Sequence, residues 1–82
     1  MKIVGVAFQK NDLLISLPSP NRHHHLLKVL ADNEINHIGF EQGFLSDCGI
    51  FLSRSYARGL AMRNGQCPEP RHSKYLFSED LW

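Results

Sequence analysis

The sequence has no long hydrophobic run, only two cysteines and almost no net charge. No apolar stretch approaches the roughly 18 residues that a membrane-spanning helix needs, and the N-terminus lacks the apolar core of a signal peptide. Cys48 and Cys67 are too few for a disulfide scaffold, and their spacing matches no paired zinc-binding pattern. We therefore expect a soluble, cytoplasmic protein whose thiols are reduced.

Catalytic and metal-binding signatures are also missing. The sequence contains no nucleophile elbow, no paired-carboxylate spacing and no Walker loop, and Cys48 has no obvious neighbouring base. The triplet His23-His24-His25 cannot converge on one metal, because consecutive helical residues point about 100° apart. We expect no catalytic residue, no metal and no cofactor, so binding is the default function.

The formal net charge of +1 hides an uneven distribution. Residues 1–30 and 54–74 are mostly basic, whereas residues 31–47 carry carboxylates and no Lys or Arg. One interpretation is a local anion site, and the other is three ordinary solvated faces. A general nucleic-acid surface would need a higher net charge, so we expect no nucleic-acid partner.

The size of the chain favours a single domain that assembles with copies of itself. With 82 residues, it can bury only about 60–65% of its unfolded surface. A hydrophobic content of 43% with 21% charged residues favours a globular fold over disorder. Because oligomerisation would add the burial that a small core lacks, we expect a homo-oligomer.

The first half of the chain predicts a β-hairpin followed by a helix. β-Branched and aromatic residues favour strands over Lys2–Gln9 and Leu13–Leu17. Ser19 or Asn21 is expected to cap a helix that runs to about Asn33. The apolar face expected for this helix contains His23, Leu26, Leu27 and Leu30.

The second half predicts a loop, a second hairpin and a second helix. The loop or short strand covers residues 34–42 and is expected to be anchored by Ile35, Ile38 and Phe40. Gly49 can adopt the positive φ that a short hairpin turn needs. Ser53 then stands at the N-cap and Gly65 at the C-cap of a helix over Arg54–Asn64.

The last residues are unusually apolar for a chain terminus. Two prolines favour an extended path for Gln66–Ser73. The C-terminal tail, Tyr75–Trp82, is rich in aromatic and apolar residues and is expected to dock on its own core or on a neighbouring subunit. We therefore predict one domain over residues 1–82, with an α+β core over 1–74. This core is a small antiparallel sheet with two helices in the order ββα–ββα, followed by the extended tail.

Cations lie at the starts of both predicted helices. Arg22 and His23 open the first helix, and Arg54 and Arg58 open the second. The helix dipole favours anions at this end, so a cation there costs stability unless an anion is bound. Arginine can grip a phosphate bidentately. The conflict therefore points to a bound phosphate or carboxylate.

Several of these residues have a second interpretation. Arg58 can instead pair with Asp47 or Glu69. Arg71 lies on a basic segment that can close over a pocket or cross a subunit interface. The aromatic residues that can stack on a base or simply fill the core are Phe44, Phe51, Tyr56 and Tyr75.

Five short motifs, spread over about four-fifths of the chain, form a specific combination. They are Arg22-His23-His24, Gln42-Gly43-Phe44, Gly49–Arg54, Asn64-Gly65-Gln66 and Leu76–Trp82. This combination resembles that of the anti-Thoeris phage sponge family. The resemblance implies a phage counter-defence protein that is oligomeric and not an enzyme. It implies sequestration of a cyclic ADP-ribose isomer or a cyclic oligonucleotide, without cleavage, in the cytoplasm of an infected bacterium.

The resemblance also implies ligand pockets between subunits, formed by arginines and an aromatic residue. The matching positions here are Arg22, Phe44, Arg54 and Arg71. The chain departs from the family by a shorter segment before Gln42 and by Ile50, where a basic or polar residue is expected. Both departures bear on whether a pocket is retained.

Two other functions remain open. A phage-encoded protein inhibitor, similar to an anti-CRISPR protein, would act by direct contact with a host defence complex, with Tyr75–Trp82 as its interface anchor. A nucleic-acid-binding accessory module would use Arg54, Arg58 and Arg63, and the near-zero net charge counts against it.

Overall fold

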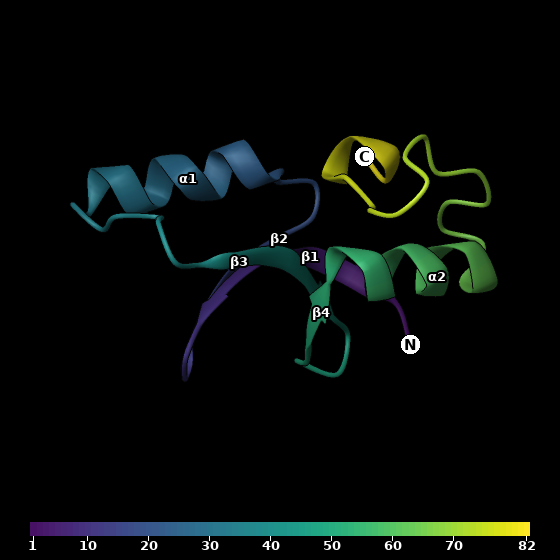
Figure 1. Cartoon of the computed structure of the whole chain (residues 1–82), viewed down its shortest axis with the longest axis horizontal. Helices are drawn as coiled ribbons and strands as arrows, with labels where there is room; N and C mark the ends of the chain where they lie inside the picture. The colour runs from purple at the N-terminus through teal and green to yellow at the C-terminus, as the bar shows by residue number, and fades with distance from the viewer.

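A curved four-stranded antiparallel sheet, in the order β2-β1-β3-β4, organises the chain (Figure 1). The computed structural model describes all 82 residues. The strands are β1 (Ile3–Lys10), β2 (Leu13–Pro18), β3 (Glu41–Ser46) and β4 (Phe51–Ser53). The predicted α+β class and the ββα–ββα order are confirmed. No helix is long and apolar enough to cross a membrane.

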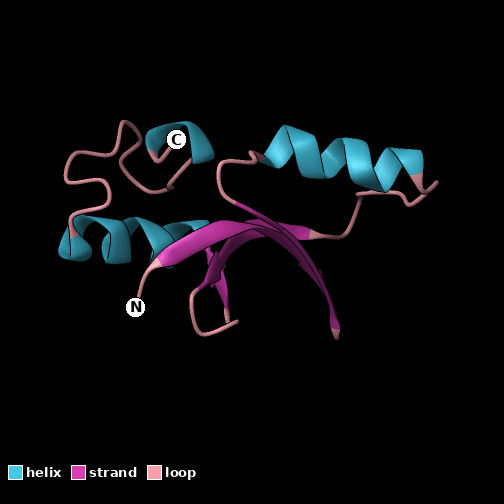
Figure 2. Cartoon of the chain, turned by 180° about the vertical axis from the view of Figure 1, so that it is seen from behind, coloured by secondary structure: helices cyan, strands magenta, loops and turns pink.

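Helix α1 (His23–Asp32) and helix α2 (Arg54–Asn64) pack on one side of the sheet, together with the C-terminal tail (Figure 2). Alternation along the strands directs apolar side chains to this side. One core cluster of 12 buried residues results, drawn from the strands, both helices and the tail. Its largest members with under 2% exposure are Phe8, Phe44, Leu26, Leu30, Leu76 and Val6.

The second hairpin and helix form as the sequence predicts. Gly49 has a φ of 78° in the turn between β3 and β4. The Ser53 hydroxyl accepts a hydrogen bond from the Tyr56 N–H at 3.2 Å, and Gly65 ends α2 with a φ of 83°. Both predicted helix caps are therefore confirmed. The sequence could predict them because each cap depends on residues that are close in sequence.

The predicted start of the first helix is wrong. The N-cap is Arg22, and neither Ser19 nor Asn21 occupies it. Asn21 instead closes a turn, since its backbone and side-chain N–H groups both donate to the Pro18 carbonyl, at 3.1 Å and 2.8 Å. The Arg22 N–H donates to the His25 Nδ1 atom at 2.8 Å, which satisfies one donor at the helix start.

Two of the three predicted loop anchors are also wrong. Ile35 and Ile38 are 41% and 69% exposed, whereas Phe40 packs against the core. The cause is local: Glu34 adopts a left-handed φ of 58°, and the Ile35 N–H bonds back to the Leu30 carbonyl at 2.8 Å. These contacts close the end of α1 and turn the following loop outward.

The C-terminal tail packs on its own core, between the start of α1 and α2 (Figure 1). Leu76 and Ser78 are buried, and the Leu76 N–H donates to the Arg54 carbonyl at 3.0 Å. One turn of 3-10 helix, η1 (Ser78–Asp80), bends the tail. The predicted extended path therefore does not hold for the whole tail.

Candidate functional site

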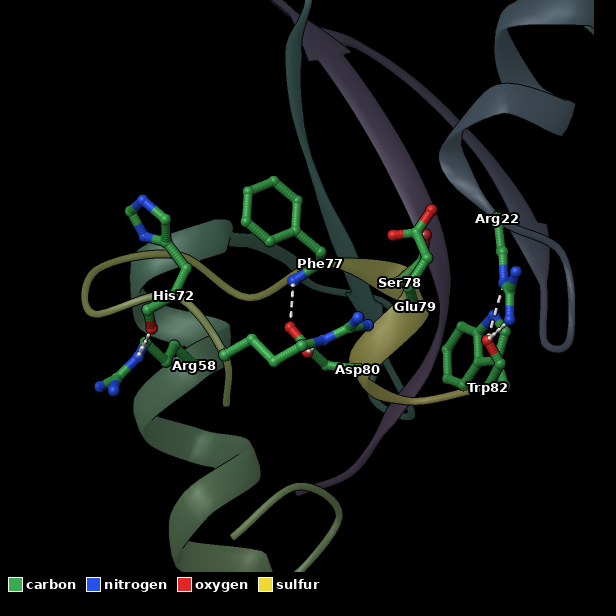
Figure 3. Close-up of polar contacts among 9 residues, drawn as sticks. Arg22, Arg58, His72, Phe77, Ser78, Glu79, Asp80 and Trp82 are labelled. Atoms are coloured by element: carbon green, nitrogen blue, oxygen red, sulfur yellow. Dashed lines mark hydrogen bonds and ion pairs between the residues drawn. The ribbon is translucent and has the colours of Figure 1, made fainter. Parts of the chain in front are cut away.

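The structure gathers five of the predicted site residues around the C-terminal tail and the segment that leads to it. These five are Arg22, His23, Arg54, Arg58 and Arg71, and they come from the starts of both helices and from the segment before the tail. Figure 3 shows the Arg22 side chain at Trp82, in the tail, and the Arg58 side chain at His72, in the segment that leads to the tail. The sixth, Phe44, is fully buried beneath it, so its ring has no face open to solvent.

Arg22 holds the end of the tail. Its guanidinium Nε donates to the backbone oxygen of Trp82 at 2.7 Å, and its Nη2 contacts the same atom. The indole Nε1 of Trp82 donates to the Asn21 carbonyl at 2.6 Å. An oxygen of the protein itself thus lies where the sequence predicted an external anion, at the N-terminus of α1.

Arg58 and Arg71 are also held by oxygen atoms of the protein. The Arg58 Nε donates to the His72 carbonyl at 2.8 Å, so the predicted alternative of a pair with Asp47 or Glu69 is not formed. The Arg71 Nε lies 3.1 Å from the Asp80 carboxylate. Both contacts tie the segment before the tail to its neighbours, and Figure 3 shows the one between Arg58 and His72.

Asp80 is the buried partner in its pair. Its side chain is 3% exposed, and its second oxygen accepts from the Phe77 N–H at 3.0 Å (Figure 3). Burial opposes the charged form, but the Phe77 N–H and the Arg71 guanidinium outweigh it. The pKa of Asp80 therefore lies below its usual value of 3.8.

His23 lies in an aromatic niche beside Arg54. Its ring stacks on Phe8 with centroids 6.1 Å apart and meets the edge of Phe44 at 5.0 Å. Burial is the main cause that places the pKa of His23 below its usual 6.5, opposed by the Gly43 hydrogen bond and assisted by the Arg54 charge. We infer that this imidazole is neutral near pH 7.

Arg54 differs from Arg22, Arg58 and Arg71, the three other arginines among the predicted site residues. Its guanidinium makes no hydrogen bond and no ion pair, and lies 5.3 Å from the Tyr75 ring centre and 5.7 Å from that of Phe77. It borders a hollow of about 300 Å³ on the surface, called the Arg54 hollow below. The hollow is lined by Phe40, Glu41, Gln42, Ser53, Arg54, Ser55 and Tyr75.

The Arg54 hollow is lined mostly by polar groups. The hydroxyls of Ser53 and Ser55 lie 3.3 Å apart, and Ser53 is already engaged as the N-cap of α2. The Glu41 carboxylate also lines the hollow and carries the charge opposite to that of the Arg54 guanidinium. The hollow thus combines a free cation, hydroxyl and amide groups, one carboxylate and the partly exposed ring of Tyr75.

Sequence reasoning placed Arg54 at a helix start but missed Gln42 and Ser55 as lining residues. Their polar side chains alone carried no signal, because only the pairing of β3 with β4 brings residue 42 beside the start of α2. A second, mostly apolar hollow of about 510 Å³ was missed as well. It is lined by Met1, Glu41, Ile50, Phe51, Leu52, Ser53 and Tyr56.

Comparison with known proteins gives one match. A family model described as Phage T4 y16D protein matches residues 2–82. No curated protein and no solved structure matches the chain. The family match supports the phage origin that the sequence resemblance implied, and its description names no ligand or activity. Since the match spans all of the chain but its first residue, the chain belongs to the phage T4 y16D protein family.

Proposed function

We propose that this phage protein binds and sequesters a cyclic nucleotide immune signal of its host without cleaving it. The carrying observation is the Arg54 guanidinium, which has no polar partner and lies near two aromatic rings, 5.3 Å from the centre of Tyr75 and 5.7 Å from that of Phe77, at the edge of a hollow. The resemblance to anti-Thoeris sponges supplies the class of ligand, a cyclic ADP-ribose isomer or a cyclic oligonucleotide. The function is counter-defence in an infected cell.

Arg54 is the group that would hold a phosphate. It is the first residue of α2, where the helix dipole favours an anion, and its donors are unused. Tyr75 holds one face of the guanidinium and is itself 41% exposed, so its ring can also meet a base. Arginine with an aromatic neighbour is a common arrangement for recognising phosphate and base together.

Glu41 narrows the choice of ligand. A simple anion would be repelled by this carboxylate, which lines the same hollow as Arg54. A nucleotide can satisfy both groups, because its phosphate can pair with the guanidinium while a ribose hydroxyl or a base amine donates to the carboxylate. We therefore expect inorganic phosphate to bind much more weakly than the nucleotide.

The volume of the Arg54 hollow supports a site shared between subunits. About 300 Å³ lies at the lower end of the range for small-molecule sites, so one copy holds only part of a cyclic dinucleotide. The apolar hollow is adjacent, since both are lined by Glu41 and Ser53. A second subunit that covers the apolar hollow would complete the nucleotide site and account for the expected homo-oligomer.

The test is a thermal-shift screen with cyclic ADP-ribose isomers and cyclic dinucleotides, run beside native mass spectrometry. A ligand present at 100 times its Kd should raise the Tm by about 15 °C. Heat denaturation should return the ligand intact, and recovery of a hydrolysed product would replace the sponge with an enzyme. A screen in which no nucleotide shifts the Tm removes the proposal.

A pair of arginine variants separates ligand binding from general charge effects. Arg54→Gln should abolish the ligand-induced shift with little change in the Tm of the free protein, because Arg54 has no polar partner to lose. Arg63→Gln removes a charge from the exposed last turn of the same helix and should retain the shift. Equal loss in both variants would contradict a local site at Arg54.

The alternative function is inhibition of a host complex by direct contact. Its favouring observation is the apolar hollow, where Ile50 and Tyr56 are each 52% exposed. The predicted anchor, the C-terminal tail, is less suited, since Leu81 and Trp82 already pack against the core. Ile50→Asp should abolish co-purification with one host protein if contact is the function, whereas Arg54→Gln, outside the apolar hollow, should leave that co-purification intact.

A further inference from the structure

We propose that the C-terminal tail is a proton-operated latch, docked while His23 is neutral and released when His23 takes up a proton. The proposal concerns the free protein and needs no ligand. It stands on the contacts between His23 and the tail and on how little of the core the tail provides.

The hydrogen bonds of His23 select one neutral tautomer. The Nε2 atom lies 2.7 Å from the Gly43 carbonyl, which can only accept, so Nε2 carries the hydrogen. The Nδ1 atom lies 3.3 Å from the Ser78 hydroxyl and can accept from it. A single neutral imidazole thus bridges β3 and the tail.

Each element packed against His23 either excludes water from the imidazole ring or places a charge near it. Strands β1 and β3 present the rings of Phe8 and Phe44 and one carbonyl. Helix α2 contributes the Arg54 cation, and η1 contributes the Glu79 carboxylate. Burial and Arg54 lower the pKa of His23, whereas the Gly43 hydrogen bond and Glu79 raise it, and the net direction is downward.

Release of the tail would relieve this penalty. Ser78, which is 1% exposed, covers the Nδ1 side of the ring, and its departure lets water reach a charged imidazole. The released state therefore binds the proton more tightly than the docked state. By linkage, lowering the pH below 6.5 shifts the population towards release.

The tail can leave without unfolding the rest of the protein. Of the 12 residues in the core cluster, the tail contributes only Leu76. Leu81 and Trp82 pack against the cluster from partly buried positions, and the other anchors are polar, including Arg22 to Trp82 and the pair of Asp80 with a 73% exposed Arg71. Segments with few buried apolar contacts open at a lower free energy than the whole fold.

The proposed release changes two other features. It frees the Arg22 guanidinium from the Trp82 oxygen, and it removes the Tyr75 ring from the Arg54 hollow. Only the removal of Tyr75 from the hollow rests on the proposed function. It predicts that the nucleotide binds more weakly in acid. The latch itself is tested without any nucleotide, so either proposal can fail while the other stands.

Trp82 provides the readout because it is the only tryptophan and lies in the tail. Its indole donates to the Asn21 carbonyl when docked, so release should red-shift its emission. We expect this shift as the pH falls from 6.5, while the far-UV circular dichroism of the helices and sheet is retained. Two results would overturn the latch. One is that the emission and the circular dichroism change together at every pH, and the other is that the emission stays unchanged until the protein unfolds in acid.

Three variants identify the titrating group. His23→Gln should remove the emission transition above acid unfolding, whereas His37→Gln, at an exposed loop position, should retain it. Glu79→Gln removes an exposed carboxylate that stabilises protonated His23 only while the tail is docked, so it should move the release transition to higher pH. This last variant remains decisive if His23→Gln does not fold, and an unmoved transition in Glu79→Gln contradicts the assignment to His23.

Discussion

At the scale of single residues, four arginines that look alike in the sequence have different roles. Arg22, Arg58 and Arg71 donate to oxygen atoms of the protein itself, and these contacts hold the segment over residues 71–82. Among these four, Arg54 alone has no hydrogen-bond or ion-pair partner. A structural role accounts for the other three without any ligand, and Arg54 is the one on which the proposed function rests.

In the ion pair of Arg71 with Asp80, removal of either side chain should lower the free energy of unfolding, but by different amounts. Asp80→Ala should lower the free energy of unfolding by about 1–3 kcal/mol, because it leaves the Phe77 N–H without its acceptor. Arg71→Ala should cost about 0.5 kcal/mol, since that side chain is 73% exposed. Urea unfolding at pH 7 measures both, and a larger loss for Arg71→Ala would contradict this division.

The same pair predicts how acid affects stability. The folded pKa of Asp80 lies below 3.8, so the unfolded chain takes up the proton first as the pH falls. The stability that Asp80 contributes is present above pH 3.8 and is lost as the pH falls through the lowered folded value. The pH range in which the Asp80 contribution to stability is lost therefore lies below the range of the proposed tail release, which begins at pH 6.5, the usual pKa of His23.

At the scale of elements, the sequence predicts well wherever neighbours in the chain decide the structure. The turn at Gly49 and the caps at Ser53 and Gly65 each depend on contacts within a few residues. The start of α1 combines local contacts, from Asn21 to the Pro18 carbonyl and from the Arg22 N–H to His25, with a distant one. The distant contact joins the Arg22 guanidinium to Trp82, 60 residues away, and a capping preference for Asn over Arg does not include it.

The candidate site shows the same limit. Arg54 and its unfavourable helix end were visible in the sequence, and so was the aromatic character of the tail. What could not be read was that the tail folds back over both helix starts, which places Tyr75 beside Arg54 and Ser78 beside His23. Long-range contacts of this kind have no periodic signature.

The pairing of β3 with β4 depends on a missing side chain at Gly43. A Cβ atom there would lie 2.2 Å from the Leu52 carbonyl oxygen and 2.6 Å from the Phe51 ring. Gly43→Ala should therefore push β4 away and lower the free energy of unfolding by about 1–3 kcal/mol. Gly49→Asn is the control, because Asn tolerates a positive φ and the turn has open space. Thermal unfolding of both variants checks the prediction.

At the scale of the whole molecule, the tail is part of its own subunit. Removal of Phe77–Trp82 should lower the free energy of unfolding by about 2 kcal/mol or more, since it deletes the contacts to Arg22 and His23. It should leave the number of subunits unchanged, because those contacts lie within one chain. Native mass spectrometry that finds fewer subunits after truncation would instead mean that the tail also joins copies.

A substitution in the tail offers a milder comparison. Trp82→Phe keeps the backbone oxygen that Arg22 binds but loses the donor to the Asn21 carbonyl, at an expected cost of about 1 kcal/mol. Thermal unfolding should therefore rank this variant between the intact and truncated chains.

Both ends of the chain are engaged, and this decides where a label can be attached. Met1 lines the apolar hollow, and Trp82 is enclosed by Arg22 and Asn21. An affinity tag at either end would therefore interfere with a surface of functional interest. The α1–β3 loop lies away from both chain ends in Figure 1 and contains the exposed Ile38, so it is the better position for an inserted epitope or fluorophore.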